Sequence, residues 1–198
     1  MKNYKILLTV LVLSAASAFS AKAQNVAIKT NLLYDATATI NAGVEVGLAP
    51  KWTLDLSGNL NAWNWNSGMR LKHYLIQPEL RYWFCERFNG SFLGVHALGG
   101  QYNIGKFPPS IMSLPIIKNH PSLANSRYQG WYVGAGVAYG YSFILSKHWN
   151  LELELGAGYI YTRYDVFECK DCDKKVVSDR PKHYVGPTKA AINLIYEF

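Results

Sequence analysis

The sequence is poor in charge and has no long apolar run after its first 20 residues. Charged side chains make up 17% of its 198 residues, whereas an average globular chain has about 25%. Beyond residue 20 no stretch reaches the roughly 18 consecutive apolar residues of a transmembrane helix, which excludes a helical membrane protein for the mature chain. The hydrophobic content of 49% is too high for a disordered segment, and the length allows one or two domains at most.

The N-terminus has the parts of a secretory signal peptide. A basic start is followed by an apolar segment at 6–19 and by the small-residue pattern Ala-Lys-Ala at 21–23. We therefore expect a cleaved signal peptide at 1–23 and one mature domain at 24–198, with an uncleaved anchor helix as the alternative. Cleavage would remove three lysines and leave 17 basic against 13 acidic residues. That small excess does not indicate nucleic acid as a partner.

The mature chain alternates between apolar and polar residues with period two, which predicts strands. In one such segment Val44 and Val46 flank Glu45. Each predicted strand has about ten residues or more, longer than the soluble average of about 5–6 and close to the 9–11 of a membrane-spanning strand. The predicted strands lie at 25–34, 38–48, 52–63, 71–83, 90–103, 129–143, 149–162 and 185–198. Eight long strands without intervening helices predict an all-β fold, an eight-stranded antiparallel up-and-down transmembrane β-barrel.

The connections between these strands alternate in length. Those at 49–51, 84–89 and 145–148 are short, whereas 104–128 and 163–184 are long. Outer-membrane barrels have short periplasmic turns at one end and longer outer loops at the other. The pattern therefore favours the outer membrane of a Gram-negative bacterium.

The polar faces of the strands carry charged residues, which we expect to line the lumen as a network of ion pairs. An eight-stranded barrel is just wide enough for side chains to fill it, and charges placed there must be paired. The expected network consists of Lys29, Glu45, Asp55, Glu79, Arg81, Glu152, Glu154 and Lys189. A soluble lipocalin-like binder is the alternative fold. It would pack Val44, Leu54 and Leu153 in the centre and turn Glu45 and Glu152 outward.

Aromatic residues near the strand ends favour lipid outside the barrel, because such residues form girdles at membrane interfaces. The last strand also ends on an aromatic residue, Phe198, which is similar to the signal that outer-membrane assembly machinery recognises. The expected girdle residues are Tyr34, Trp52, Trp83, Trp131, Tyr161 and Tyr196.

Much of the mature chain resembles an uncharacterised family of small secreted proteins from Bacteroidota-type bacteria, classed as a domain of unknown function. The resemblance is specific between 27 and 103 and does not include 163–183. It is carried by residues 29–35, 43–47, 51–57, 71–85, 88–96, 100–103 and 186–189. It implies a small OmpA/OmpX-like outer-membrane barrel, with relatives near fimbria-like surface systems, and it brings no catalytic residues.

The three cysteines are expected on opposite sides of the membrane. Cys85 falls in a short turn and is expected to be unpaired, whereas Cys169 and Cys172 fall in the last outer loop. This pair is spaced to close a small disulfide; metal binding with His183 and a redox site are the alternatives. We expect no cofactor and no metal.

The sequence leaves three functions open. The first is a structural or surface-interaction barrel that contacts membrane lipid, lipopolysaccharide and, through loops 104–128 and 163–184, a protein partner. The second is a narrow channel for ions or small solutes. The third is a lipid A-modifying enzyme, for which His73, Ser67 and Asp55 are candidates, or His96 beside Glu79 or Glu152. No compact motif joins these groups, so we do not expect an enzyme.

Overall fold

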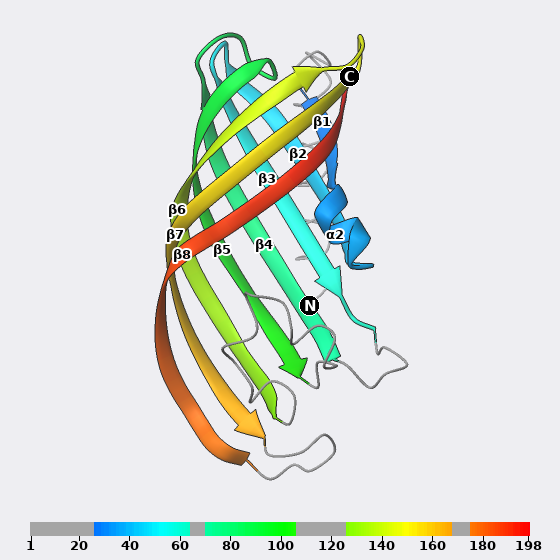
Figure 1. Cartoon of the computed structure of the whole chain (residues 1–198). Coiled ribbons are helices and arrows are strands. Elements are labelled where there is room, and N and C mark those ends of the chain that lie inside the picture. The colour runs from blue at the N-terminus through cyan, green and yellow to red at the C-terminus, as the bar shows by residue number, and fades with distance from the viewer. Residues whose placement is uncertain (1–25, 64–69, 106–125, 168–174) are drawn as a thin grey trace, which may run out of the picture.

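The computed structural model describes residues 26–63, 70–105, 126–167 and 175–198. Within these residues the chain forms eight strands and one short helix. They are β1 (Val26–Asn31), α2 (Leu32–Ala36), β2 (Ile40–Ala49), β3 (Trp52–Asn61), β4 (Arg70–Trp83), β5 (Gly90–Gly105), β6 (Arg127–Ile144), β7 (Trp149–Phe167) and β8 (Lys175–Glu197). Every strand pairs antiparallel with its chain neighbours, and β1 pairs with β8, so the sheet closes on itself (Figure 1). The prediction of an all-β chain with eight antiparallel strands is confirmed.

The strands never become shorter along the chain. β1 has 6 residues, β2 and β3 have 10, and β8 has 23. One end of the barrel is level, while at the other end each later strand reaches further, and β6 to β8 curve beyond the rest (Figure 1). We call these the short-turn end, where 50–51, 84–89 and 145–148 connect the strands, and the long-loop end.

The longest strand therefore adjoins the shortest at a seam between β8 and β1. Their pairing runs only from Ala27 opposite Glu197 to Asn31 opposite Asn193. The Asn31 side chain extends it by one step, donating to the carbonyl of Ala190 (3.3 Å) and accepting from the N–H of Ile192 (3.3 Å). The same oxygen accepts from the Leu33 N–H and caps α2. Asn31 thus ends the ladder and starts the helix that lies beside it.

Apolar side chains lie on the outer face of the sheet and charged side chains on the inner face, as we expect for a membrane barrel. Val44, Leu54 and Leu153 point outward and are 43–45% exposed, whereas Glu45 and Glu152 are fully buried inside. The lipocalin-like arrangement, with those three aliphatic side chains in the centre, is not found. No helix among the described residues is long and apolar enough to cross a membrane.

Two expected girdle residues are wrong. Tyr34 lies in α2 and lines a cavity inside the barrel. Trp83 has no exposed surface and packs inside the barrel at the short-turn end, where its ring lies 4.7 Å from that of Phe92. Its Nε1 donates to the Thr53 hydroxyl (2.9 Å). Together with Ala27, Phe88 and Ile195 these two rings form an apolar cluster that fills this end.

Other expectations need correction, and some fall on residues that the structure does not describe. The first strand ends at Asn31, not at 34, because α2 begins there. The predicted loop 163–184 is largely strand, since β7 continues to Phe167 and β8 starts at Lys175. The expected signal peptide (1–23), most of loop 104–128, Ser67, Cys169 and Cys172 lie outside the described residues. Cys85 is an exposed free thiol in the 84–89 turn.

Candidate functional site in the barrel interior

Arg81 is the centre of the ion-pair network in the lumen. Its side chain has no exposed surface, and its Nε lies 2.7 Å from Glu79 Oε1. Nη1 lies 2.8 Å from Glu45 and 2.9 Å from Glu152, while Nη2 lies 2.9 Å from Glu154. The planar guanidinium suits this role because it presents five N–H donors in fixed directions. One side chain from β4 thereby links carboxylates of β2, β4 and β7.

Two lysines complete the network from the seam strands. Lys29 of β1 pairs with Glu45, and Lys189 of β8 lies 2.8 Å from Glu79 and 3.0 Å from Glu154. The structure thus brings together all eight residues that the sequence assigned to the lumen, and we call them the charge network. Asp55 is held least closely, at 3.5 Å from Lys29 and Arg81 and 3.8 Å from Lys189.

Small residues on the inner face make room for these side chains. A Cβ at Gly94 would lie 2.5 Å from Glu79 Oε1, and one at Gly140 would lie 2.3 Å from the Phe92 ring. β6 contributes only small residues to this level, including Gly136 and Ala138. The interior is therefore as crowded as the glycine-rich polar faces indicated.

His96 lies beside the network. Its Nε2 lies 2.9 Å from the Thr188 hydroxyl and its Nδ1 3.5 Å from Glu79 Oε2. A hydroxyl, an imidazole and a carboxylate in this order are the elements of a nucleophilic site. However, the contact to Glu79 is longer than a hydrogen bond, and Glu79 is already held by Arg81 and Lys189. His96 Nδ1 makes no hydrogen bond, so the carboxylate does not orient the imidazole.

The other proposed enzyme grouping is not assembled within the described residues. His73 Nδ1 lies 3.1 Å from the carbonyl of Leu71. Asp55 lies in the charge network, and Ser67 is outside the described residues. No group of three or more His, Cys, Asp and Glu side chains in the described ranges is placed to hold a metal ion.

A cavity of about 440 Å³ lies against the seam, on the side of the charge network that faces the long-loop end. We call it the seam cavity. Its floor includes Lys29, Asp55 and Lys189, and one wall is formed by α2 and the other by residues 187–191 of β8. Amide and hydroxyl side chains make up much of the remaining lining: Asn31, Asn41, Ser57, Asn59, Gln77, Thr188 and Asn193. Sequence reasoning missed this cavity, although period two already places most of these residues on the inner faces.

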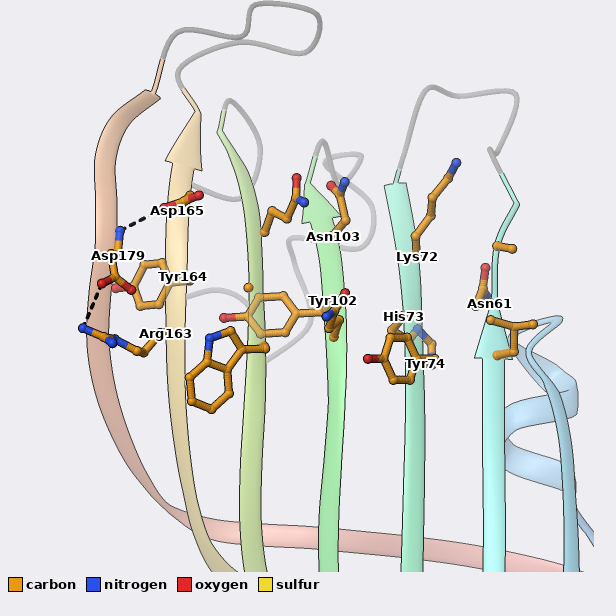
Figure 2. A pocket seen from close by; sticks show the side chains of 16 residues that line it. Asn61, Lys72, His73, Tyr74, Tyr102, Asn103, Arg163, Tyr164, Asp165 and Asp179 are labelled. Carbon is orange, nitrogen blue, oxygen red and sulfur yellow. Dashed lines mark hydrogen bonds and ion pairs between the residues drawn. The ribbon is translucent and has the colours of Figure 1, made fainter. Parts of the chain in front are cut away.

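A second cavity, the rim pocket, lies nearer the long-loop end and has a volume of about 500 Å³. Figure 2 shows Tyr74, Tyr102 and Tyr164 around it, with an ion pair between Arg163 and Asp179 (2.8 Å) on one wall. His73 lines both cavities, so the two adjoin along the barrel.

The rim pocket has one perturbed acid. Lys175 lies 2.7 Å from Asp165, and the Asp179 N–H donates to the same carboxylate at 2.9 Å. These hydrogen bonds, first from Lys175 and then from Asp179, hold the pKa of Asp165 below its ordinary value. Because this acid lies at the rim, where its side chain is 25% exposed and that of Lys175 50%, the stabilisation that follows is small.

The comparisons with known proteins assign a family. The family model described as "Protein of unknown function (DUF3575)" matches residues 8–198. The chain belongs to this family. A comparison with curated proteins finds no match. Membership confirms the resemblance noted in the sequence at the level of the family.

Proposed function

We propose that the mature chain is a small outer-membrane β-barrel of a Gram-negative bacterium, of the OmpA/OmpX-like kind, with a plugged lumen and a structural or surface-interaction role. The observation that carries this proposal is the inversion of the two faces. Buried charges lie inside, where Arg81 and Glu152 have no exposed surface, while Val137 (60%) and Leu155 (72%) are exposed outside. A protein surrounded by water would pay a large penalty for this arrangement, whereas lipid removes it.

Aromatic side chains on the outer face support the same proposal. At the short-turn end Trp52 contacts Tyr82 and Trp149 contacts Tyr196, each with ring centres 5.1 Å apart. The apolar part of β7 lies between Trp149 and the exposed Tyr159. Tyr159 follows Trp149 by ten positions. At about 3.3 Å per residue and a tilt of about 40°, this corresponds to roughly 25 Å along the barrel axis. This equals the height of the apolar band in outer-membrane barrels, about 25 Å.

The contents of the lumen favour a plugged barrel over the channel alternative. The charge network spans the interior. Between it and the short-turn end, the apolar cluster that includes Trp83, Phe92 and Ile195 fills the barrel. An ion would have to displace both layers, and the first is held by buried ion pairs that are costly to break singly.

The long-loop end is the surface that we propose for contacts outside the cell. There β6 to β8 project beyond the rest of the barrel (Figure 1), and their exposed side chains include Lys175, Arg180 and Lys182. Basic residues at this level would attract lipopolysaccharide phosphates. A protein partner, in a fimbria-like surface system as the family resemblance implies, would bind here through 104–128 and 163–184. At the other end Phe198 would serve as the contact for the assembly machinery.

Location is tested by expressing the full chain in a Gram-negative host. We expect the protein in the outer-membrane fraction, resistant to carbonate extraction, and migrating differently in gels before and after boiling. Release into the soluble fraction on carbonate washing would contradict the proposal and favour the lipocalin-like alternative.

Plugging is tested by conductance of the purified protein in planar bilayers. We expect no steady openings. Steady openings that Glu79→Gln or Arg81→Met abolish or alter would instead establish the channel. Mass spectrometry of lipid A with and without the protein tests the enzyme alternative, and we expect identical spectra.

A further inference from the structure

Two buried polar atoms of the seam cavity lack a hydrogen-bond partner among the residues that the structure describes. Gln77 is 4% exposed, and its Nε2 has no hydrogen-bond acceptor. Asp55 is 1% exposed, and its Oδ1 makes no hydrogen bond, although Lys29 Nζ lies 3.5 Å from it. Both residues line the cavity, from adjacent strands β4 and β3. A buried polar atom without a partner destabilises the fold, because it has lost its hydrogen bonds to water. One donor and one acceptor left in the same cavity point to a bound molecule.

Three other polar side chains of the cavity lining are already hydrogen-bonded within the protein, so they act as a preformed wall. Asn41 donates to Asp35 (2.7 Å) and accepts from the Asn31 N–H (2.6 Å). Asn193 donates to Glu152 (2.7 Å), and Thr188 is engaged with His96. A ligand would therefore meet fixed surroundings with two specific contacts to make.

The charges at the cavity floor favour a neutral ligand. Lys29 and Lys189 face the cavity but are each bound to carboxylates at their other side, and Asp55 lies between them at 3.5 and 3.8 Å. An added anion or cation would lose its hydration and meet a floor in which charges of both signs are already paired. A neutral molecule avoids this cost.

We propose that the seam cavity binds a neutral polyhydroxylated molecule, a mono- or disaccharide, through Asp55 Oδ1 and Gln77 Nε2. A hydroxyl both donates and accepts a hydrogen bond, so neighbouring hydroxyls on one ring satisfy both atoms. The volume of about 440 Å³ falls within the usual range of about 300–1,000 Å³ for small-molecule sites. The Tyr34 ring from α2 and the His73 ring from β4 lie 6.4 Å apart at the wall and supply flat surfaces for the apolar face of a sugar.

The experiment uses the mature full-length protein folded in a detergent without a sugar headgroup. Folding is verified by the gel shift on boiling. Glucose, N-acetylglucosamine and lactose are titrated separately, and binding is measured by calorimetry and by saturation transfer from protein to ligand in NMR. We expect at least one of the three to saturate a single site.

Gln77→Leu removes the unsatisfied donor and is expected to weaken that binding about tenfold, the equivalent of one hydrogen bond of roughly 1.4 kcal/mol. If it fails to fold, Gln77→Glu, which also removes the donor at nearly constant volume, takes its place. The matched control is Ser142→Ala, which removes another buried hydroxyl without a partner on the inner face, but outside the cavity lining. It should leave affinity unchanged.

Absence of saturable binding by all three sugars, or equal affinities of the Gln77 variants and the wild type, would overturn the proposal. Binding of a neutral dipeptide amide or of inorganic phosphate, with no binding of sugars, would also overturn it. The result does not depend on where the protein resides, because binding is measured in micelles and location in cells. Failure of one proposal is thus distinguishable from failure of the other.

Discussion

The barrel contains an inner ion pair in its interior and an outer ion pair at its rim, of nearly the same length in opposite surroundings. Arg81 lies 2.9 Å from Glu154 with both side chains fully buried, whereas Arg163 lies 2.8 Å from Asp179 with side chains 42% and 60% exposed. The two pairs have nearly equal N–O distances, but they differ in the burial of their side chains. Breaking a buried pair leaves a charge without water or partner, whereas an exposed charge is solvated again at once. The inner pair should therefore be essential and the outer one dispensable.

The largest effect is expected for Arg81→Met. It leaves five buried carboxylates facing two lysines, and loss of one partner of a buried pair costs about 3–5 kcal/mol or more. Urea titration of the protein in lipid vesicles, followed by tryptophan fluorescence, measures the free energy of unfolding. Arg163→Met is the matched control and should cost less than about 1 kcal/mol. Similar losses for the two variants would refute the distinction between the inner and outer pairs.

A charge placed on the outer face tests what surrounds it. Leu155 is 72% exposed and lies in the middle of β7. The substitution Leu155→Arg should lower the free energy of unfolding in vesicles by about 2–4 kcal/mol. Val185 is 80% exposed and lies opposite Tyr159, near the outer aromatic belt. The substitution Val185→Arg should lower the free energy of unfolding by only about 0–1 kcal/mol. If Leu155→Arg is as harmless as Val185→Arg, the apolar belt does not contact lipid.

The crowding of the inner face is tested by enlarging a glycine. At Gly94 the new side chain would meet Glu79, which Arg81 holds in place. We expect Gly94→Ala to cost about 1–3 kcal/mol. At Gly58, on the outer face of β3, a Cβ would meet no atom within 4 Å, so Gly58→Ala is the control. Equal melting temperatures of the two variants would show that the inner side chains have room to move.

The smallest effect concerns Asp165 at the rim. Its pKa in the folded chain is below the ordinary 3.8, so its contribution to stability is complete above that value and is lost as the pH falls through the folded pKa. A titration of its carboxyl carbon by NMR should give a midpoint below 3.8. Lys175→Met removes the main cause and should move the midpoint upward. An unchanged midpoint would contradict the role of Lys175.

The alternation with period two predicted which side chains point into the lumen. It could do so because the side of a strand that contacts lipid or core is apolar, which leaves the polar residues on the other side. It placed Lys29, Glu45 and Arg81 inside together, and it also places Trp83 inside, two residues after Arg81. The girdle assignment of Trp83 was wrong because it used residue type where the alternation already gave the face.

The seam and the extended strands could not be predicted in this way. The projecting part of β8 has exposed residues on both sides, so no alternation marks 175–184 as a strand. α2 has only five residues, too few to show helical periodicity. The unsatisfied atoms of Asp55 and Gln77 depend on distances across three strands and on the place where β1 ends, and neither is encoded in local sequence.

Spin labelling tests most directly whether lipid surrounds the middle of the outer face. In a background in which Cys85, Cys169 and Cys172 are replaced by serine, single labels are placed at Val137 and, as the rim control, at Lys182. In vesicles the label at Val137 should collide often with oxygen and rarely with a water-soluble nickel chelate, and the label at Lys182 should do the reverse. Equal collision rates with the chelate at both positions would contradict the account.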